Sequence, residues 1–479
     1  MSAPDLTIEI IDQLRASGAE KHTSLLLGAG ASTTSGLPGW DELATRLLVG
    51  SGSVVDLESA QLLLSRQDPL IVVEAARAEY GDKWLRKVRN ALYEGVASTE
   101  FSPLQLATVA HVLGGDPADT SLITLNFDVL LEQALSCALD DQDGSKVRSA
   151  ADRSESRDDR PYVVHHLHGV VSPTVTDEVV LTLTDFLNLI SDSTSWQMEL
   201  LRDSIARGAV IIAGTSYRDP DVRQWLHAAL QDAPEEHAAI VLLARQGFGV
   251  DKAQFAQLKR SLSAQWRAVG MRPVLMHDFS DAAQVIRELR HVNVDGYLAP
   301  QERARLIWDF HTDQFEALQS AYVTELGADA EALRRVLDVE RLNLTLWIAD
   351  GEGRLARWAA QDRVYLNPAG LRTVETGYDS PWIAGKALAS ESLLFQDLPT
   401  DHIRQWSSVL ALPVPTPHPT LPTMTSAVLT IGLPDRARKY EKSKLLWGEL
   451  LATIGDRWST RLTESVFRAD DGTTIASID

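Results

Sequence analysis

Residues 24–32, SLLLGAGAS, form the stretch that decides the fold. The run Ser24–Leu27 is largely apolar and predicts a short buried strand, and Gly28 and Gly30 follow it directly. Glycine lets a backbone approach a phosphate closely, and the free amides at the start of a following helix attract negative charge. Thr33 stands where the usual dinucleotide-binding pattern has its third glycine. The stretch predicts a nucleotide-binding loop, with an ordinary glycine turn between a strand and a helix as the alternative.

Two further apolar runs also end in small or polar residues. The strand expected at 121–125 leads into Asn126 and Asp128, and the strand expected at 209–213 leads into Gly214–Ser216. Ligands collect outside the carboxyl ends of parallel strands, so these residues are expected to face the same crevice as the first glycine loop. Capping of the following helix is the alternative reading for the asparagine and the aspartate.

Three histidines lie close together in the segment 162–169, which is expected to be a strand. Strand alternation would place His166 and His168 on one face and His165 on the other. A metal site is not favoured, because neither cysteine nor carboxylate stands at ligand spacing. His168 precedes a glycine at the strand end and is predicted to be a catalytic or orienting imidazole, with a hydrogen-bonded core histidine as the alternative.

The order of elements predicts three regions. Helical spacing between residues 40 and 113 indicates a helical insertion after the first strand, and alternating strands and helices then continue to the end of the first region, 1–297. A helical connector is expected over 298–327. Antiparallel strand signals and a closing helix predict a separate α+β domain over 328–479.

Composition narrows the classes of function. A net charge of −21 and a pI near 5.0 argue against nucleic-acid binding and against binding to anionic membranes. Apolar runs are too short to span a bilayer, so a soluble cytoplasmic protein is expected. The single cysteine, Cys137, excludes an intrachain disulfide and is expected to be a small buried residue on a helix.

Four segments together resemble the sirtuin-like NAD-binding family: GAGASTTSGLPGW at 28–40, TLNFD at 124–128, HLHG at 166–169 and AGTSYRDPD at 213–221. The resemblance implies a Rossmann-like α/β fold and NAD as substrate. It also implies a role for each matching residue. The pyrophosphate loop would be Gly28, Ala29, Gly30 and Ser32, the nicotinamide ribose would meet Asn126 and Asp128, the essential histidine would be His168, and the far ribose and adenine would meet Gly214, Thr215 and Ser216.

Departures from the family narrow the expected activity. Members that deacylate lysine carry a four-cysteine zinc module and a glutamine before the asparagine, whereas this chain has one cysteine and Leu125 at that position. Deacylation and a bound metal are therefore not expected. The LNFD and LPGW forms look more like the bacterial anti-phage branch, whose members hydrolyse NAD. Residues 328–463 look like a GAF sensor domain, particularly in 406–414 and 426–431.

The resulting prediction is a regulated NAD hydrolase that releases nicotinamide and ADP-ribose. Catalysis would fall to Asn126 and His168. The expected partners are further copies of the chain and a defence protein or phage-derived trigger that relieves a restraint by the C-terminal domain. A non-catalytic sensor of NAD or ADP-ribose is the main alternative, and an NAD-dependent deacylase or ADP-ribosyl transferase is a further one.

Overall fold

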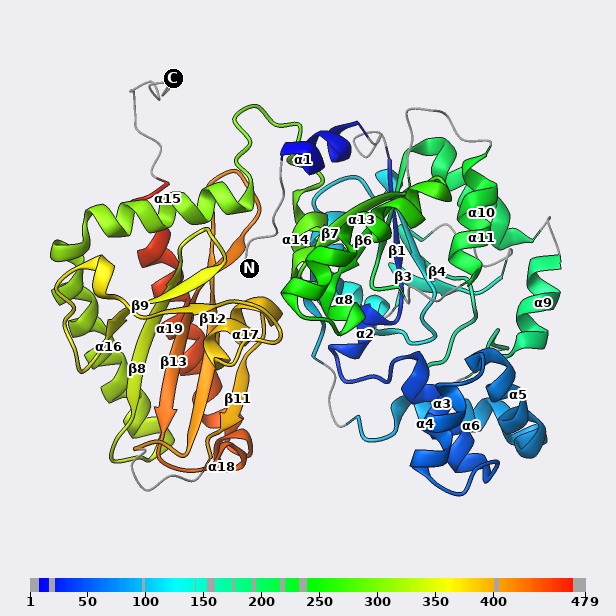
Figure 1. The fold of residues 1–479 in the computed structure, drawn as a ribbon, viewed down its shortest axis with the longest axis horizontal. Coiled ribbons are helices and arrows are strands. Elements are labelled where there is room, and N and C mark those ends of the chain that lie inside the picture. Colours follow the sequence, from blue (N-terminus) through cyan, green and yellow to red (C-terminus); the bar gives the residue numbers. More distant parts are fainter. Residues whose placement is uncertain are drawn as a thin grey trace. The chain divides into compact units, whose positions relative to one another are not determined.

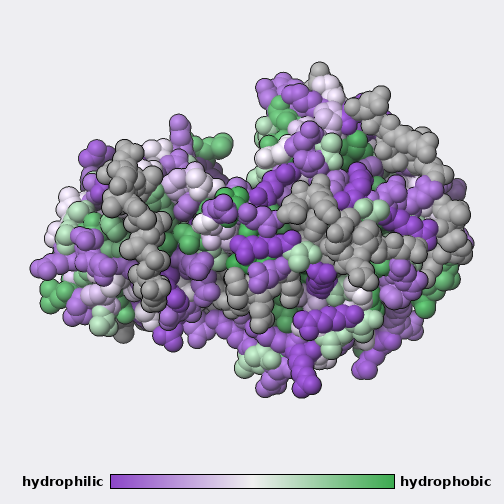
Figure 2. All heavy atoms as spheres, turned by 90° about the horizontal axis from the view of Figure 1, so that it is seen from above, coloured by the Kyte–Doolittle hydropathy of each residue, from purple (hydrophilic) through white to green (hydrophobic). Residues whose placement is uncertain are grey.

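The computed structural model describes residues 8–16, 22–96, 100–142, 144–152, 160–174, 176, 178–191, 195–215, 220–231, 239–399 and 405–467. The chain forms two compact units, Ile8–Val292 and the residues from Asn293 onward (Figure 1). No helix in this described part is both long and apolar enough to cross a bilayer. Hydrophilic residues dominate the visible face in Figure 2, in keeping with the net charge of −21.

A seven-stranded parallel sheet organises the first unit. Its strand order is β3-β4-β2-β1-β5-β6-β7, and every pairing is parallel. The strands are β1 Thr23–Leu27, β2 Thr120–Thr124, β3 Val147–Ala150, β4 Tyr162–His166, β5 Ala209–Ala213, β6 Ala239–Ala244 and β7 Arg272–Met276. Without the edge strand β3, this order is that of the Rossmann fold. The α/β prediction for this unit is therefore confirmed.

The reversal of strand order lies at β1. This strand pairs with β2 on one side and with β5 on the other, and each of its residues is buried. A parallel strand in the middle of a sheet is covered on both faces, which is why its sequence is apolar without alternation. The carboxyl end of β1 is thus the topological switch point, where ligands of such sheets bind.

Helices cover the two faces of this sheet. Apolar side chains of α10, α11 and α13 share a core with Leu26, Ile212 and Val241 of the strands, and α7 packs against both α8 and α14. The helices outside the insertion are α1 Ile8–Arg15, α8 Leu130–Leu139, α9 Leu183–Ser191, α10 Trp196–Arg207, α11 Pro220–Leu230, α12 Arg245–Phe248, α13 Lys252–Ala268 and α14 Phe279–Glu288.

The predicted helical insertion is present between β1 and β2. It comprises α2 Gly30–Thr33, α3 Trp40–Ser51, α4 Leu57–Leu64, α5 Pro69–Tyr80, α6 Trp84–Tyr93 and α7 Pro103–Leu113. Helices α3–α6, which we call the helical module, have a core of their own that includes Leu47, Val73 and Val88. Phe127 and Leu181 from the sheet side join this core. The module is therefore packed against the segments that follow β2 and β4.

An antiparallel sheet of six strands forms the second unit, in the order β10-β9-β8-β13-β12-β11. Its strands are β8 Asn343–Ala349, β9 Arg354–Ala360, β10 Thr373–Glu375, β11 Leu394–Asp397, β12 Ser408–Thr416 and β13 Met424–Leu433, and its helices are α15 Pro300–Asp313, α16 Phe315–Leu337, α17 Ile383–Ser390, α18 Ala437–Glu441 and α19 Lys444–Thr463. The predicted α+β character is present, while the likeness to a GAF domain stays a prediction.

The expected connector over 298–327 needs revision. Helix α15 ends at Asp313 and a new helix begins at Phe315. Ile307 of α15 and Leu326 of α16 are fully buried in the core that the antiparallel sheet forms with α19. These helices therefore belong to the second unit, because burying their apolar faces requires that sheet.

Candidate active site

A cavity of about 220 Å³ lies where the loops after β1, β2 and β4 meet the helical module. Six of the residues singled out from the sequence line it: Gly28, Ala29, Ser32, Asn126, Asp128 and His168. The helical module supplies part of the opposite wall, including Trp40, Leu43 and Leu70. The structure thus brings the first glycine loop and the polar strand ends to one place, as the parallel topology predicts.

The glycines at the switch point allow two loops to touch. A β-carbon on Gly28 would lie 2.5 Å from the Cα of Thr215, and one on Gly30 would lie 2.9 Å from the Cα of Gly214. The amide of Gly28 donates to Ala213 O at 3.0 Å, and that of Gly30 donates to Gly214 O at 2.7 Å. These two amides therefore form hydrogen bonds within the protein. The close contact between the two loops explains why glycine is needed at both positions, which the sequence did not reveal.

Four of the predicted site residues are not among those that line the cavity. Gly30, Gly214 and Thr215 belong to the paired loops but do not line the cavity, and Gly214 has a positive φ of +67°. Ser216 lies outside the described residues. The assignment of these positions to a pyrophosphate or an adenine ribose stays a prediction.

Asn126 is held at several points. Its main-chain amide donates to Thr124 Oγ1 at 3.0 Å, and its side-chain Nδ2 donates to Ser32 Oγ at 3.0 Å. The side-chain oxygen Oδ1 is buried and has no hydrogen-bond partner within the described part of the chain. A buried acceptor left unpaired costs about 1–3 kcal/mol, so a donor that reaches this oxygen gains binding energy. Capping of α8 does not account for this side chain.

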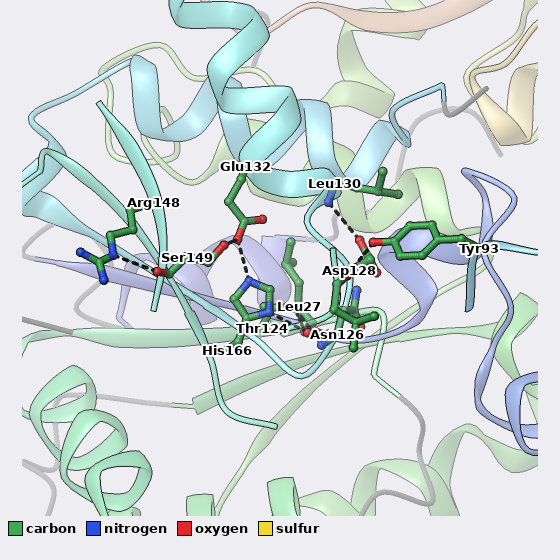
Figure 3. A network of polar contacts seen from close by, with 11 residues as sticks. Leu27, Tyr93, Thr124, Asn126, Asp128, Leu130, Glu132, Arg148, Ser149 and His166 are labelled. Carbon is green, nitrogen blue, oxygen red and sulfur yellow. Dashed lines mark hydrogen bonds and ion pairs between the residues drawn. The ribbon is translucent and has the colours of Figure 1, made fainter. Parts of the chain in front are cut away.

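Asp128 is a buried carboxylate beside this amide. Its Oδ1 accepts from the main-chain amide of Leu130 at 3.1 Å, as the capping reading proposes. Burial raises the pKa of Asp128, while hydrogen bonds from Ser32 and Leu130 work in the opposite direction. Burial and the charge of Asp128, which lies beside Tyr93 in Figure 3, raise the pKa of Tyr93. The Tyr93 hydroxyl donates to Val171 O at 2.7 Å. Asp128 therefore has both a capping role and a position on the cavity wall.

His168 is enclosed by aromatic rings. Its ring centroid lies 5.2 Å from that of Phe186, 6.0 Å from that of Trp225 and 6.5 Å from that of Phe127. Gly169 follows with a φ of +94°, and a β-carbon there would lie 2.2 Å from Glu178 O. Glycine thus permits the turn that keeps His168 at the cavity, which explains the His-Gly pair in the sequence.

The prediction that His166 and His168 lie on the same face of one strand is only partly correct. Strand β4 ends at His166, so His168 lies in the following turn and strand alternation does not relate the two rings. His166 is fully buried, with Nδ1 2.8 Å from Asn126 O and Nε2 2.6 Å from Glu132 Oε1. Glu132 was not recognised from the sequence, although it stands one helical turn after Asp128.

Two other expectations concern metals and the cysteine. In the described ranges, no group of three or more histidines, cysteines and carboxylates is arranged to hold a metal ion. Cys137 lies on α8 as expected, but it is exposed rather than buried, so the prediction of a buried residue is wrong. The apolar face of α8 that packs inward instead carries Leu131 and Leu135.

Comparison with models of protein families finds a match within the first unit. Residues 120–273 match the SIR2-like domain family. The matched segment runs from β2 into β7 and contains Asn126, Asp128 and His168, whereas the glycine loop at 28–32 precedes it. No curated protein matches the chain. The match supports the resemblance of the first unit to the sirtuin-like family and its NAD-binding fold.

Proposed function

We propose that the first unit hydrolyses NAD to nicotinamide and ADP-ribose. The observation that carries this proposal is that Asn126, whose buried Oδ1 has no hydrogen-bond partner among the described residues, lines the same cavity as His168 and Asp128. The SIR2-like match over 120–273 supports NAD as the ligand. A buried acceptor beside an imidazole is a suitable pair of groups for holding and deprotonating a water molecule.

The reaction requires little acid catalysis. The bond between C1′ of the ribose and the pyridinium nitrogen breaks, and its electron pair neutralises the ring, so nicotinamide leaves as a neutral molecule. The oxygen of water bonds to C1′, and the proton that water loses passes to His168. Asn126 Oδ1 accepts a hydrogen bond from the same water and orients it toward C1′. Positioned proton transfer of this kind contributes about 10²- to 10⁴-fold to a rate.

The cavity suits the reacting end of the dinucleotide. Its volume of about 220 Å³ is below the roughly 300–1,000 Å³ of pockets that take whole ligands of drug size. Leu70, Val180 and Phe186 offer an apolar wall for the nicotinamide ring. Asp128 is the acceptor available for the carboxamide of nicotinamide. The pyrophosphate would then extend along Gly28 and Ala29.

The amide of Asn126 provides the test. In Asn126→Ala, nicotinamide release should fall about 10²- to 10³-fold in kcat, because the lost group acts mainly in the transition state. The KM for NAD should change little. Asn90→Ala, at an exposed position of α6, is the matched control and should keep full activity.

Two outcomes would contradict the proposal. If the unmodified protein binds NAD without releasing nicotinamide in both the resting and the triggered state, the site is a sensor of NAD or ADP-ribose instead. If Asn126→Ala loses affinity and turnover in proportion, the asparagine is a binding residue.

We also propose that this activity serves anti-phage defence and is restrained until a trigger arrives. The support is the resemblance of the segments at 28–40 and 124–128 to that bacterial branch. Unrestrained hydrolysis would deplete the host's own NAD, so a resting state is required. Cells that express the unmodified protein should lose NAD after phage infection, and cells that express Asn126→Ala should not. Light scattering of the resting and triggered protein tests the expected homo-oligomer.

A further inference from the structure

His166 does not line the cavity, yet it holds the backbone of a residue that does. Its fully buried ring bridges two acceptors, Asn126 O at 2.8 Å and Glu132 Oε1 at 2.6 Å (Figure 3). Glu132 Oε1 also accepts from the hydroxyl of Ser149 in β3. Three segments, β4, the loop after β2 and helix α8, therefore meet at one imidazole.

The chemistry of these partners fixes the protons on the ring. A carbonyl oxygen can only accept, so the short contact to Asn126 O requires a proton on Nδ1. An ionised carboxylate at Nε2 requires a proton there as well, and a ring with both protons is an imidazolium. Without the negative charge, a buried imidazole would be neutral and would carry a single N–H.

The surroundings of His166 agree with this assignment. Burial alone works to lower its pKa, but the charge and hydrogen bond of Glu132, the Asn126 carbonyl and the charge of Asp128 together raise it above the ordinary value. The neighbouring His165 shows the opposite result. Burial, with the charges of His166 and Arg207, lowers the pKa of His165 to about 4.

We propose that Glu132 and His166 form a positioning pair that fixes the Asn126–Phe127 peptide plane and thereby aims the Asn126 amide into the cavity. The inference rests on the proposed function of Asn126. Losing the Nδ1 donor would leave a buried carbonyl unpaired and free this peptide to turn. Asn126 would then move relative to the reacting water, and Phe127, which packs near His168 with ring centroids 6.5 Å apart, would move with it.

Three variants separate the donor from the charge. His166→Leu removes the hydrogen bond to Asn126 O. His166→Asn places an amide N–H near the position of Nδ1 and keeps that bond without the link to Glu132. Glu132→Gln removes the charge, yet its amide donates to Nε2 and so leaves a neutral ring with its proton on Nδ1. His165→Asn, on the same strand, is the matched control.

Nicotinamide release from NAD is the first readout. His166→Leu should lower kcat about 10- to 100-fold with a change in KM of less than about threefold, because small displacements of an aligned group cost about this much. His166→Asn should recover most of the loss, and His165→Asn should match the unmodified protein. Glu132→Gln should keep its activity above the pH at which His166 loses its proton. Folded His166→Leu with full kcat, or His166→Asn as slow as His166→Leu, would overturn the proposal.

Nuclear magnetic resonance provides a readout that does not need activity. With ¹⁵N-labelled asparagine, the side-chain amide signal of Asn126 should shift in His166→Leu and return in His166→Asn. With ¹⁵N-labelled histidine, both ring nitrogens of His166 should carry protons at pH 7. An unprotonated Nδ1, or an unmoved Asn126 signal, would contradict the positioning pair. If the unmodified protein releases no nicotinamide in either the resting or the triggered state while these signals behave as expected, the proposed function is wrong and the pair is retained.

Discussion

Among the residues that the structure describes, each unit has one histidine with no exposed surface, and the pKa values of these two histidines are shifted in opposite directions. In the first unit, His166 lies between a main-chain carbonyl and the Glu132 carboxylate, and its pKa is raised. In the second unit, His311 contacts Ile307 O at 2.7 Å and the hydroxyl of Tyr322 at 2.9 Å. Burial lowers the pKa of His311 to about 4, so this ring is neutral at pH 7.

The difference shows that burial alone does not mark a functional site. His311 packs among the rings of Tyr322 and Trp358, and its two polar contacts complete a core whose partners are neutral. His166 is joined to a carboxylate, and the next residue in its network, Asn126, has a buried side-chain oxygen without a hydrogen-bond partner in the described part of the chain. The first unit thus differs from the second in having a carboxylate bonded to its buried histidine and, in a residue that lines the cavity, an acceptor without a partner among the described residues.

The largest expected effect breaks the chemistry without altering the fold. His168→Ala should lower kcat for nicotinamide release about 10²- to 10⁴-fold, because the group that accepts the proton of water is removed. His227→Ala, at an exposed position of α11, should keep its activity. Steady-state kinetics with circular dichroism of both variants checks this. Undiminished release by folded His168→Ala would remove this histidine from the mechanism.

A pair of glycine substitutions compares the two units by stability. Gly28→Ala should lower the free energy of unfolding by about 1–3 kcal/mol, because the new β-carbon meets backbone atoms of the loop after β5. Gly327→Ala should raise it by about 0.5–1 kcal/mol, since this position in α16 has open space around it. Urea unfolding measures both. A Gly28→Ala protein as stable as the unmodified one would show that the loops are not tightly paired.

Acid should destabilise the second unit through His311. The pKa of about 4 in the folded protein lies below the unfolded value near 6.5, so the unfolded state binds more protons between these pH values. The stability contributed by the neutral ring is present above pH 6.5 and is lost as the pH falls toward 4. Between pH 7 and 5.5, the unmodified protein should lose about 1 kcal/mol relative to His311→Asn. An equal change in the free energy of unfolding of the two proteins between pH 7 and 5.5 would contradict this.

His166 should show the opposite sign and the smallest effect. Its pKa is raised on folding, so its contribution is fully present below the unfolded pKa near 6.5 and is lost as the pH rises through the folded pKa. In urea unfolding measured from pH 6 upward, the free energy of unfolding of the unmodified protein should therefore decline with rising pH. That of Glu132→Gln should show no such decline. An equal pH dependence of the two proteins would mean that Glu132 does not hold a charged ring.

The sequence carries most of the information for the parallel sheet. Apolar runs without alternation located β1, β2 and β5 to within a residue or two, and residues that follow β1 and β2 line the cavity, whereas Gly214 and Thr215 after β5 do not. The break between α15 and α16 was missed, because apolar spacing is helical on both sides and only packing on the antiparallel sheet separates the helices.

The part of the candidate site that could be predicted from the sequence consists of residues that directly follow a strand. Asn126, Asp128 and His168 follow strands and reach the cavity directly. The Glu132–His166 pair depends on helix α8 and strand β4, 34 positions apart along the chain, lying together. The need for Gly28 and Gly30 likewise depends on the loop at Gly214, which lies far along the chain. Such contacts arise from tertiary structure and leave no local pattern.

The most direct test of the central claim is the fate of oxygen when the protein acts on NAD in water enriched in ¹⁸O. Mass spectrometry should find nicotinamide and ADP-ribose in equal amounts, with one ¹⁸O at C1′ of the ADP-ribose after correction for exchange of that hydroxyl with water. Asn126→Ala should form both products far more slowly. NAD that remains intact under resting and triggered conditions, or ADP-ribose recovered on protein without ¹⁸O, would contradict hydrolysis at this site.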